Sequence, residues 1–380
     1  MMRRIRFLHV VKDDKFFHPI MEAFSKCNEI ESKSVLFKRR KVLSYIKEKD
    51  NVEIYSEERA FVERIIKSDY DVLYLHSLPL YLYKFIKHIP KDKIVIWWTY
   101  GYDIYGQQIL GLDSFINLNF YGKQTQRARL DVPTIVKLKR LYAKYIISPK
   151  LAKQREYIIS RIDYFQPVCD IDYELMVEYA GLKAKKFYTP FWGNFYTGNE
   201  ATRKMQFDGS VLIGNSAAYV QNHFDVWDAI KQYIDESREV VVPLSYGVRY
   251  YANQIIKIGD KDSHNMLFLD KFLPQEEYFK IFERCSYAVF GTIRQHAMGN
   301  VYNALLRGLK VFFYKESYVY KYLKKLGCVV FAIEDINMRS FVEPLSIEDQ
   351  QLNIEALKKE RADNRRIGEQ AINELLGKFK

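Results

Sequence analysis

Residues 287–306 read YAVFGTIRQHAMGNVYNALL and combine an apolar run, a polar loop and a helical pattern in one unit. The run at 287–290 predicts a buried strand, and the run beginning at Val301 predicts a helix. A helix start offers unbonded N–H groups and the positive end of a dipole. Arg294 adds a charged fork that can bind an anion through two hydrogen bonds. The unit is therefore typical of an anion site, with an ordinary polar surface loop as the alternative.

Similar units recur along the chain, because short apolar runs alternate with amphipathic stretches. This alternation predicts βαβ units and parallel sheets. The expected strands are 5–11, 72–76, 94–99, 164–168 and 187–191, then 210–215, 240–244, 266–269, 287–290, 311–314 and 329–332. A polar stretch at 196–209 separates the two series and is interpreted as a linker. We predict two Rossmann-like α/β domains, 1–197 and 198–345, and a final helix over 346–380, where Ser346 and Asp349 resemble an N-cap.

The composition sets the broad class of protein. The chain has 380 residues, 48% of them apolar, which is ample for two packed cores. No stretch reaches the roughly 18–20 apolar residues that span a bilayer, and the N-terminal residues 1–8 predict a strand rather than a signal peptide. The cysteines lack C-x-x-C spacing, which argues against a zinc site and a disulfide framework: Cys27, Cys169, Cys285 and Cys328. We expect a cytoplasmic protein.

The positive charge of the chain is concentrated in one segment. The net charge is +12, and residues 114–161 hold eleven Lys or Arg against two acids. A basic surface rich in tyrosine suits either a nucleic acid or an anionic membrane. No nucleic-acid-binding motif accompanies it, so we expect the membrane and no nucleic acid.

The second domain begins with a strand that ends at Gly214, followed by small and amide side chains. In open α/β sheets, ligands bind outside the carboxyl ends of the strands, so this loop and the Arg294 loop share an edge. The residues expected to bind a donor nucleotide and diphosphate are Gly214, Asn215, Ser216, Asn222, His223, Tyr246, Arg294, Gln295, Gly299 and Asn300. The alternative for the Asn and Ser residues is a helix cap.

In the first domain, the expected strand 94–99 runs into a glycine-flanked aromatic loop that contains Asp103. A carboxylate just past a strand end is a candidate general base for deprotonating a hydroxyl group, or else an N-cap. His18 follows the first strand and is a second catalytic candidate. Asp170 and Asp172 form a D-x-D pattern at a helix start, which we interpret as a cap rather than a metal site. Arg294 already supplies positive charge, so the prediction includes neither metal nor other cofactor.

Together these motifs resemble the 4-alpha-L-fucosyltransferase family, glycosyltransferase family 56. The resemblance covers roughly residues 5–335. It rests, in chain order, on residues 98–105, Gly214-Asn215-Ser216 with Asn222-His223, residues 241–246, and Arg294-Gln295 with Gly299. His296 departs from the family's type member, which has a second glutamine there.

The resemblance implies a GT-B-type architecture and an enzyme that transfers an N-acetylfucosamine-type sugar from a dTDP-sugar donor. It further implies an undecaprenyl-diphosphate-linked saccharide acceptor in bacterial surface polysaccharide synthesis. The enzyme would work on the inner face of the cell inner membrane, where segment 114–161 would dock on anionic lipid. Two alternatives stay open: a two-domain sugar-nucleotide epimerase, and a non-catalytic basic protein that binds nucleic acid.

Overall fold

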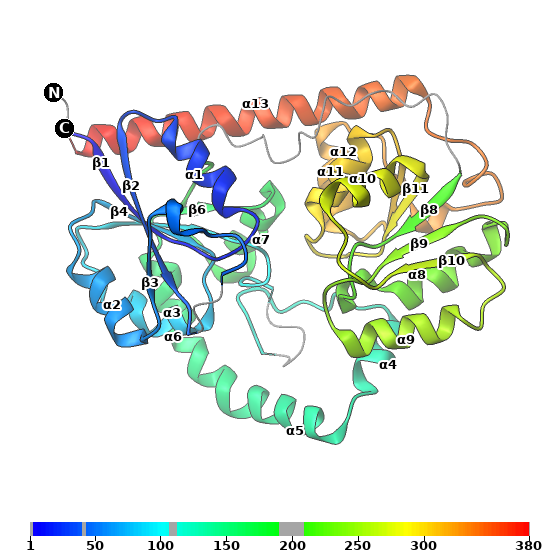
Figure 1. The fold of residues 1–380 in the computed structure, drawn as a ribbon, viewed down its shortest axis with the longest axis horizontal. Coiled ribbons are helices and arrows are strands. Elements are labelled where there is room, and N and C mark those ends of the chain that lie inside the picture. Colours follow the sequence, from blue (N-terminus) through cyan, green and yellow to red (C-terminus); the bar gives the residue numbers. More distant parts are fainter. Residues whose placement is uncertain (1–2, 40–42, 106–111, 190–208, 380) are drawn as a thin grey trace.

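The computed structural model describes residues 3–39, 43–105, 112–189 and 209–379. Their strands form two parallel sheets that lie side by side (Figure 1). The first sheet has the order β3-β2-β1-β4-β5-β6-β7, and the second has the order β10-β9-β8-β11-β12-β13. The two sheets confirm the predicted α/β fold class with two Rossmann-like units.

The first sheet is built around its predicted central strands. Its elements are β1 (Ile5–Val10), α1 (Phe17–Ser25), β2 (Ile30–Phe37), η1 (Glu48–Asp50), β3 (Val52–Tyr55), α2 (Glu58–Lys67), β4 (Val72–His76), α3 (Leu80–Ile86), β5 (Ile94–Trp98), α6 (Ser148–Arg161), β6 (Tyr164–Gln166), α7 (Asp170–Ala180) and β7 (Lys185–Lys186). The predicted strand 187–191 is wrong at 187–189, because strand pairing ends at Lys186. Residues 187–189 are buried through side-chain contacts instead; Tyr188, for example, donates a hydrogen bond to Asp170.

The second sheet contains every strand predicted for it, with ends that differ from the prediction by at most two residues. Its elements are β8 (Ser210–Ile213), η4 (Tyr219–Gln221), α8 (His223–Ile230), η5 (Lys231–Tyr233), β9 (Val240–Pro243), α9 (Arg249–Gly259), β10 (Met266–Leu269), α10 (Gln275–Arg284), β11 (Cys285–Phe290), α11 (Met298–Leu306), β12 (Lys310–Phe313), α12 (Tyr318–Leu326), β13 (Phe331–Ala332) and η6 (Ile333–Asp335). The predicted linker lies outside the described residues except for Gly209. The proposed boundary at 197/198 lies outside them too.

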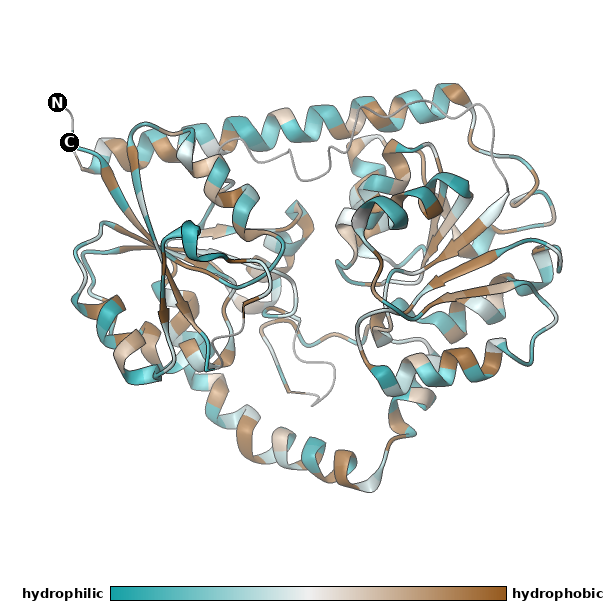
Figure 2. Cartoon of the chain, viewed as in Figure 1, coloured by the Kyte–Doolittle hydropathy of each residue, from teal (hydrophilic) through white to brown (hydrophobic). Residues whose placement is uncertain are grey.

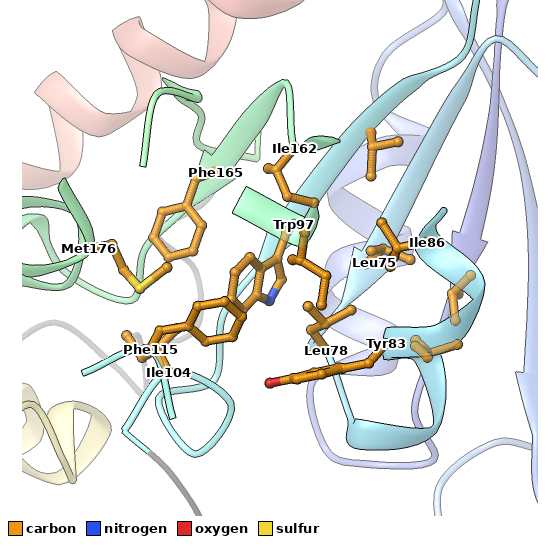
Figure 3. Packing of buried hydrophobic residues seen from close by; sticks show 14 of the residues in the cluster. Leu75, Leu78, Tyr83, Ile86, Trp97, Ile104, Phe115, Ile162, Phe165 and Met176 are labelled. Atoms are coloured by element: carbon orange, nitrogen blue, oxygen red, sulfur yellow. The ribbon is translucent and has the colours of Figure 1, made fainter. Parts of the chain in front are cut away.

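A large aromatic core fixes the end of β5 in the first domain. The Trp97 side chain is fully buried and packs between Phe115 and Phe165, at ring-centre distances of 5.2 and 5.1 Å (Figure 3). Its indole N–H donates a 2.9 Å hydrogen bond to Asp103. The core therefore positions the loop that follows β5.

Two helices cross from one domain to the other. Helix α4 (Lys123–Leu130) packs on α8 and α9 of the second domain. There the Asp225 carboxylate accepts hydrogen bonds of 2.8 Å from the backbone N–H groups of Gln124 and Thr125. The α4 start thus receives the negative charge that a helix N-terminus favours.

Helix α13 (Ile347–Lys378) runs along both domains, from the second domain back to the first (Figure 1). The Ser346 hydroxyl accepts a hydrogen bond from the Asp349 backbone N–H, which confirms the predicted N-cap. Near its end, Ala371, Ile372 and Leu375 join the core that contains β1, β4 and β5. The helix therefore ties the second domain back to the first.

We expect Leu375→Ala to lower the free energy of unfolding by about 2–5 kcal/mol, because the side chain is 0% exposed and its loss leaves a cavity. Leu352→Ala is the matched control on the same helix, where the side chain is 49% exposed. It should change stability by less than about 0.5 kcal/mol. Urea unfolding followed by circular dichroism measures both. Equal effects of the two changes would contradict docking of α13 on the first domain.

Candidate active site

The loop after β5 and the loop after β11 meet between the two sheets. Gly101 has a φ of +84°, and a Cβ placed on it would lie 2.7 Å from Gln295 Oε1. The same Cβ would lie 3.7 Å from a guanidinium nitrogen of Arg294. Glycine satisfies both the left-handed backbone and the close approach. The aromatic loop of the first domain and the anion loop of the second are therefore in contact.

Arg294 is buried at this junction, with 3% of its surface exposed. Its Nη1 donates a 2.7 Å hydrogen bond to the Gln295 carbonyl, and its guanidinium lies 4.9 Å from the centre of the Tyr105 ring. It forms no ion pair with any carboxylate in the described part of the chain. Burial lowers the pKa of Arg294 from its usual range. A buried cation without a counter-charge is costly, so the site favours an anionic ligand.

Asp172 lies at the hydroxyl end of the Tyr105 side chain and also interacts electrostatically with Arg294. It is fully buried and accepts hydrogen bonds from the Tyr105 hydroxyl at 2.7 Å and from the backbone N–H groups of Val168 and Cys169 at 3.2 and 3.4 Å. Burial raises the pKa of Asp172 to about 7. The contact with Cys169 closes the first turn of α7, so Asp172 acts as the cap that the D-x-D pattern predicted, whereas Asp170 contacts Tyr188 and Lys186.

The loop after β8 forms a second polar wall. Gly214 has a φ of +67°, and the buried Asn215 side chain donates a 2.6 Å hydrogen bond to the Tyr246 hydroxyl. The Asn215 carbonyl oxygen accepts from Gln221 at 2.5 Å and from Ser216 at 3.2 Å. Tyr246 is 56% exposed. The loop therefore presents an aromatic side chain to solvent while its amide network is fixed.

Several buried polar atoms of the second domain lack hydrogen-bond partners in the described structure. They are both ring nitrogens of His223, Gln221 Oε1 and Thr292 Oγ1. A Cβ on Gly214 would lie 2.8 Å from His223 Nε2 and 3.2 Å from Gln221 Oε1. Buried polar atoms normally have partners, so this cluster fits a place where a ligand or ordered water supplies them.

Two histidines in this cluster are held neutral. Burial lowers the pKa of His223 to about 3. Burial and then the positive charge of Arg294 lower the pKa of His296 to about 3. His296 Nδ1 lies 2.8 Å from Gln221 Nε2, which links the β11 loop to the β8 loop. At neutral pH these side chains act as hydrogen-bonding groups, and Arg294 carries the positive charge.

The remaining predicted donor residues occupy the frame of the site. Asn222 donates hydrogen bonds to the carbonyls of Gly291 at 2.7 Å and Phe120 at 3.0 Å. Its amide therefore joins the loop after β11 to the segment before α4. Helix α11 begins at Met298, one residue before the exposed Gly299, and Asn300 lies in its first turn. Ala297 precedes the helix with a φ of +61° and gives no side-chain cap.

Asp103 has the geometry of a structural carboxylate. Its two oxygens accept four hydrogen bonds: from Leu78 N and Trp97 Nε1 at 2.9 Å, from Thr99 Oγ1 at 2.7 Å and from Tyr100 N at 3.0 Å. These donors fill the acceptor sites of a carboxylate. The arrangement favours a structural role over that of a base. Asp103 closes a turn, and within the described residues no helix begins at it, so the predicted N-cap is not observed.

His18 lies on α1, where its Nε2 is 3.1 Å from the Tyr45 carbonyl and 3.5 Å from an Asp50 carboxylate oxygen. Its side chain is about half exposed, at 48%. These contacts anchor the 45–50 segment, and none of them is to a residue of the Arg294 junction.

Two charged residues just past the end of β1, Lys12 and Asp14, were not among the predicted site residues. The Lys12 ammonium lies 4.5 Å from the centre of the Tyr102 ring and 3.3 Å from its hydroxyl. Asp14 is partly buried and accepts one hydrogen bond in the described structure, from Phe16 N at 2.9 Å. Burial raises the pKa of Asp14. The run KDDK at 12–15 directly after a strand was the available signal.

Comparison with solved structures identifies the architecture as that of GT-B glycosyltransferases. The chain is similar to AviGT4, a glycosyltransferase of avilamycin A biosynthesis (TM-score 0.51, 10% identity, 98% of each chain). It is also similar to a UDP-forming alpha,alpha-trehalose-phosphate synthase from Burkholderia xenovorans (0.57, 8%, 98% of this chain and 100% of that one). Anabaena HepE in complex with UDP matches at 0.55 with 12% identity, over 98% of this chain and 99% of that one. No curated protein matches the chain in sequence.

The sequence profile of the 4-alpha-L-fucosyltransferase family, glycosyl transferase group 56, matches residues 150–354. This is more than half of the chain, and the protein belongs to that family. It is thus a glycosyltransferase of GT-B fold, which confirms the predicted family and class of enzyme. No described helix is long and apolar enough to cross a membrane. Within the described ranges, no group of three or more His, Cys, Asp or Glu side chains is placed to hold a metal ion.

We expect the stability of the wild-type protein to fall as the pH drops from 7.5 to 5. His223 stays neutral when folded, with a pKa of about 3, whereas an unfolded histidine takes up a proton below about 6.5. The unfolded state then binds more protons, so His223 alone removes about 2 kcal/mol at pH 5. Between pH 7.5 and 5, His223→Gln should therefore lose about 2 kcal/mol less of its free energy of unfolding than the wild type, as measured by urea unfolding. Between pH 7.5 and 8.5 the difference between the two proteins should stay constant, and parallel curves down to pH 5 would contradict the buried neutral imidazole.

Proposed function

We propose that this glycosyltransferase transfers an N-acetylfucosamine-type deoxy-amino sugar from a dTDP-sugar to a polyprenyl-diphosphate-linked saccharide. The observation that carries the proposal is the buried Arg294 guanidinium at the junction of the two domains, which has no ion pair among the described residues. A sugar transfer from this donor releases a nucleoside diphosphate. The guanidinium fork can bind that diphosphate through two hydrogen bonds and stabilise the charge that develops on it.

The other polar groups of the second domain fit the same ligand. The unpartnered atoms of Gln221 and His223 supply hydrogen-bonding positions beside Gly214, and Thr292 Oγ1 in the loop after β11 supplies another. The exposed ring of Tyr246 is available to stack on a base. The start of α11 offers the Gly299 N–H to a phosphate, whereas the Asn300 N–H already donates to the Ala297 carbonyl at 2.8 Å. Anabaena HepE, which shares the fold, is in complex with UDP.

We assign the acceptor side to the first domain and propose Asp14 as its general base if the reaction inverts the anomeric centre. Asp14 accepts one hydrogen bond where Asp103 accepts four, and its raised pKa shifts it toward neutral pH. Lys12 and Tyr102 lie beside the Gly101 turn that touches Gln295. The proposed base and Arg294 therefore approach the same loop from opposite domains.

The proposed place of work is the cytoplasmic face of the inner membrane, with the protein bound peripherally. A lipid-linked acceptor is presented there, and the net charge of +9 on residues 114–161 suits anionic lipid. The proposal includes neither metal nor cofactor, since Arg294 supplies the charge for the leaving group. The family membership favours a transferase over the epimerase and the nucleic-acid-binding protein.

Arg294→Met should lower turnover by about 100–1,000-fold, because it removes the charge that stabilises the leaving diphosphate. It should leave the melting temperature of the ligand-free protein unchanged or higher, since it also removes a buried unpaired charge. In a thermal-shift screen of dTDP, UDP, GDP and CMP, dTDP should stabilise the wild type most and the variant little. Arg284→Met, at a half-exposed arginine of α10, is the control. Normal turnover in Arg294→Met would disprove the diphosphate role.

Asp14→Asn and Asp103→Asn form a matched pair that separates catalysis from structure. Asp14→Asn should reduce turnover by about 100–10,000-fold while changing stability by less than about 0.5 kcal/mol. Asp103→Asn should cost about 1–3 kcal/mol, because an amide N–H₂ then faces groups that themselves donate. Turnover is measured with a dTDP-sugar at saturating acceptor, and stability by urea unfolding. Full turnover in Asp14→Asn would remove it as the base.

A further inference from the structure

Helix α5 (Thr134–Tyr142) and the π-helical turn η2 (Ala143–Ile147) expose large apolar side chains to solvent. No residue of α5 is buried. The exposed side chains are Ile135 at 58%, Leu138 at 56%, Leu141 at 52%, Tyr142 at 59%, Tyr145 at 65% and Ile146 at 43%. Figure 1 shows α5 at the outer edge of the molecule, away from both sheets, and Figure 2 shows hydrophobic residues along it.

These side chains form one face of a continuous helix. Ile135, Leu138, Tyr142 and Tyr145 follow each other at spacings of three and four residues, which places them on the same side. Lys137 and Lys139 alternate with them and flank that side. We name the face formed by residues 135, 138, 141, 142 and 145 the α5 apolar face. An apolar face with basic flanks is typical of a helix that lies in the plane of a membrane interface.

We propose that the α5 apolar face inserts into the headgroup region of an anionic bilayer and anchors the enzyme there. Charge selects lipid over a second copy of the chain. The surrounding segment 114–161 has a net charge of +9, so two copies would repel each other whereas anionic lipid attracts it. Tyr142 and Tyr145 are side chains that favour the membrane interface. The described helices hold no membrane span, and insertion in the interface plane needs none.

The anchor would hold both domains at the membrane, because α5 connects a helix packed on the second domain to a helix packed on the first. Helix α4 before it packs on α8 and α9 of the second domain, and α6 after it packs on α3 of the first. The inference deepens the proposed function by adding insertion of apolar side chains to electrostatic docking. The inference rests on the proposed function only for the presence of a lipid-linked acceptor. Binding to the bilayer is argued from the exposed apolar face and the charge around it.

The test is sedimentation of the full chain with vesicles of phosphatidylcholine containing 30% phosphatidylglycerol, on the order of the charge density of anionic membranes. The wild type should bind at low salt and keep part of its binding in 1 M salt, where surface charges are screened. Ile135→Ser/Leu138→Ser should reduce the partition coefficient at least tenfold at both salt concentrations. Lys137→Gln/Lys139→Gln should weaken binding at low salt only. Leu352→Ser, at an exposed leucine of α13, should bind as the wild type does.

A second readout separates this inference from the proposed function. The dTDP thermal shift should be the same in Ile135→Ser/Leu138→Ser as in the wild type, because the change lies outside the site. Vesicle binding that is equal in the two proteins would overturn the insertion. Failure of the wild type to bind vesicles would also overturn the insertion. This includes the outcome in which the wild type forms dimers instead and Leu138→Ser dissociates them. Loss of the dTDP shift in the wild type with normal vesicle binding would overturn the donor assignment and leave the insertion standing.

Discussion

The charge of Arg294, which is buried without an ion-paired carboxylate in the described part of the chain, is the constraint on which the junction of the two domains depends. Its guanidinium lies over the Tyr105 ring, and the hydroxyl of that ring donates to Asp172. The nearest acid on this path is therefore one ring away, and its raised pKa makes it a weak counter-charge. The polarised ring and the Gln295 carbonyl stabilise the cation in part. The remaining positive charge is uncompensated, so it favours binding of a diphosphate between the domains rather than to either domain alone.

Several buried and partly buried carboxylates hold elements of the fold in place. Asp103 fixes the turn after β5, Asp172 closes the first turn of α7, and Asp225 caps α4. Glu360 on α13 accepts hydrogen bonds from Tyr302 and Tyr322, which joins α13 to α11 and α12. A carboxylate whose lone pairs are filled by fixed donors is poorly suited to accept a proton from a substrate. Asp14 differs from them because one backbone donor leaves most of its lone pairs open.

The apolar runs in the sequence predicted the central strands well and the edges of the first sheet poorly. β4 and β10 are buried or partly buried along their length, and their bounds match the predictions. β2 was missed because Glu31 and Lys33 interrupt its pattern, and residues 187–189 were wrongly predicted because an apolar run indicates burial rather than strand pairing. The Arg294 and Gly214 loops were predictable as strand ends. The link between Gln221 and His296 was not, since it joins residues 75 positions apart whose pairing exists only in the fold.

The two helices that cross between the domains explain why α5 can stay unburied. Helix α4 is held on the second domain by Asp225, and α13 is held on the first by Leu375 and its neighbours. The domains are thus linked at two places without any contribution from α5. A helix with no buried residue gains little stability from its apolar side chains in water, and exposing them costs solubility. The exposed apolar face is therefore unfavourable for the protein in water. At a bilayer surface the same side chains leave water, while the lysines beside them remain in it.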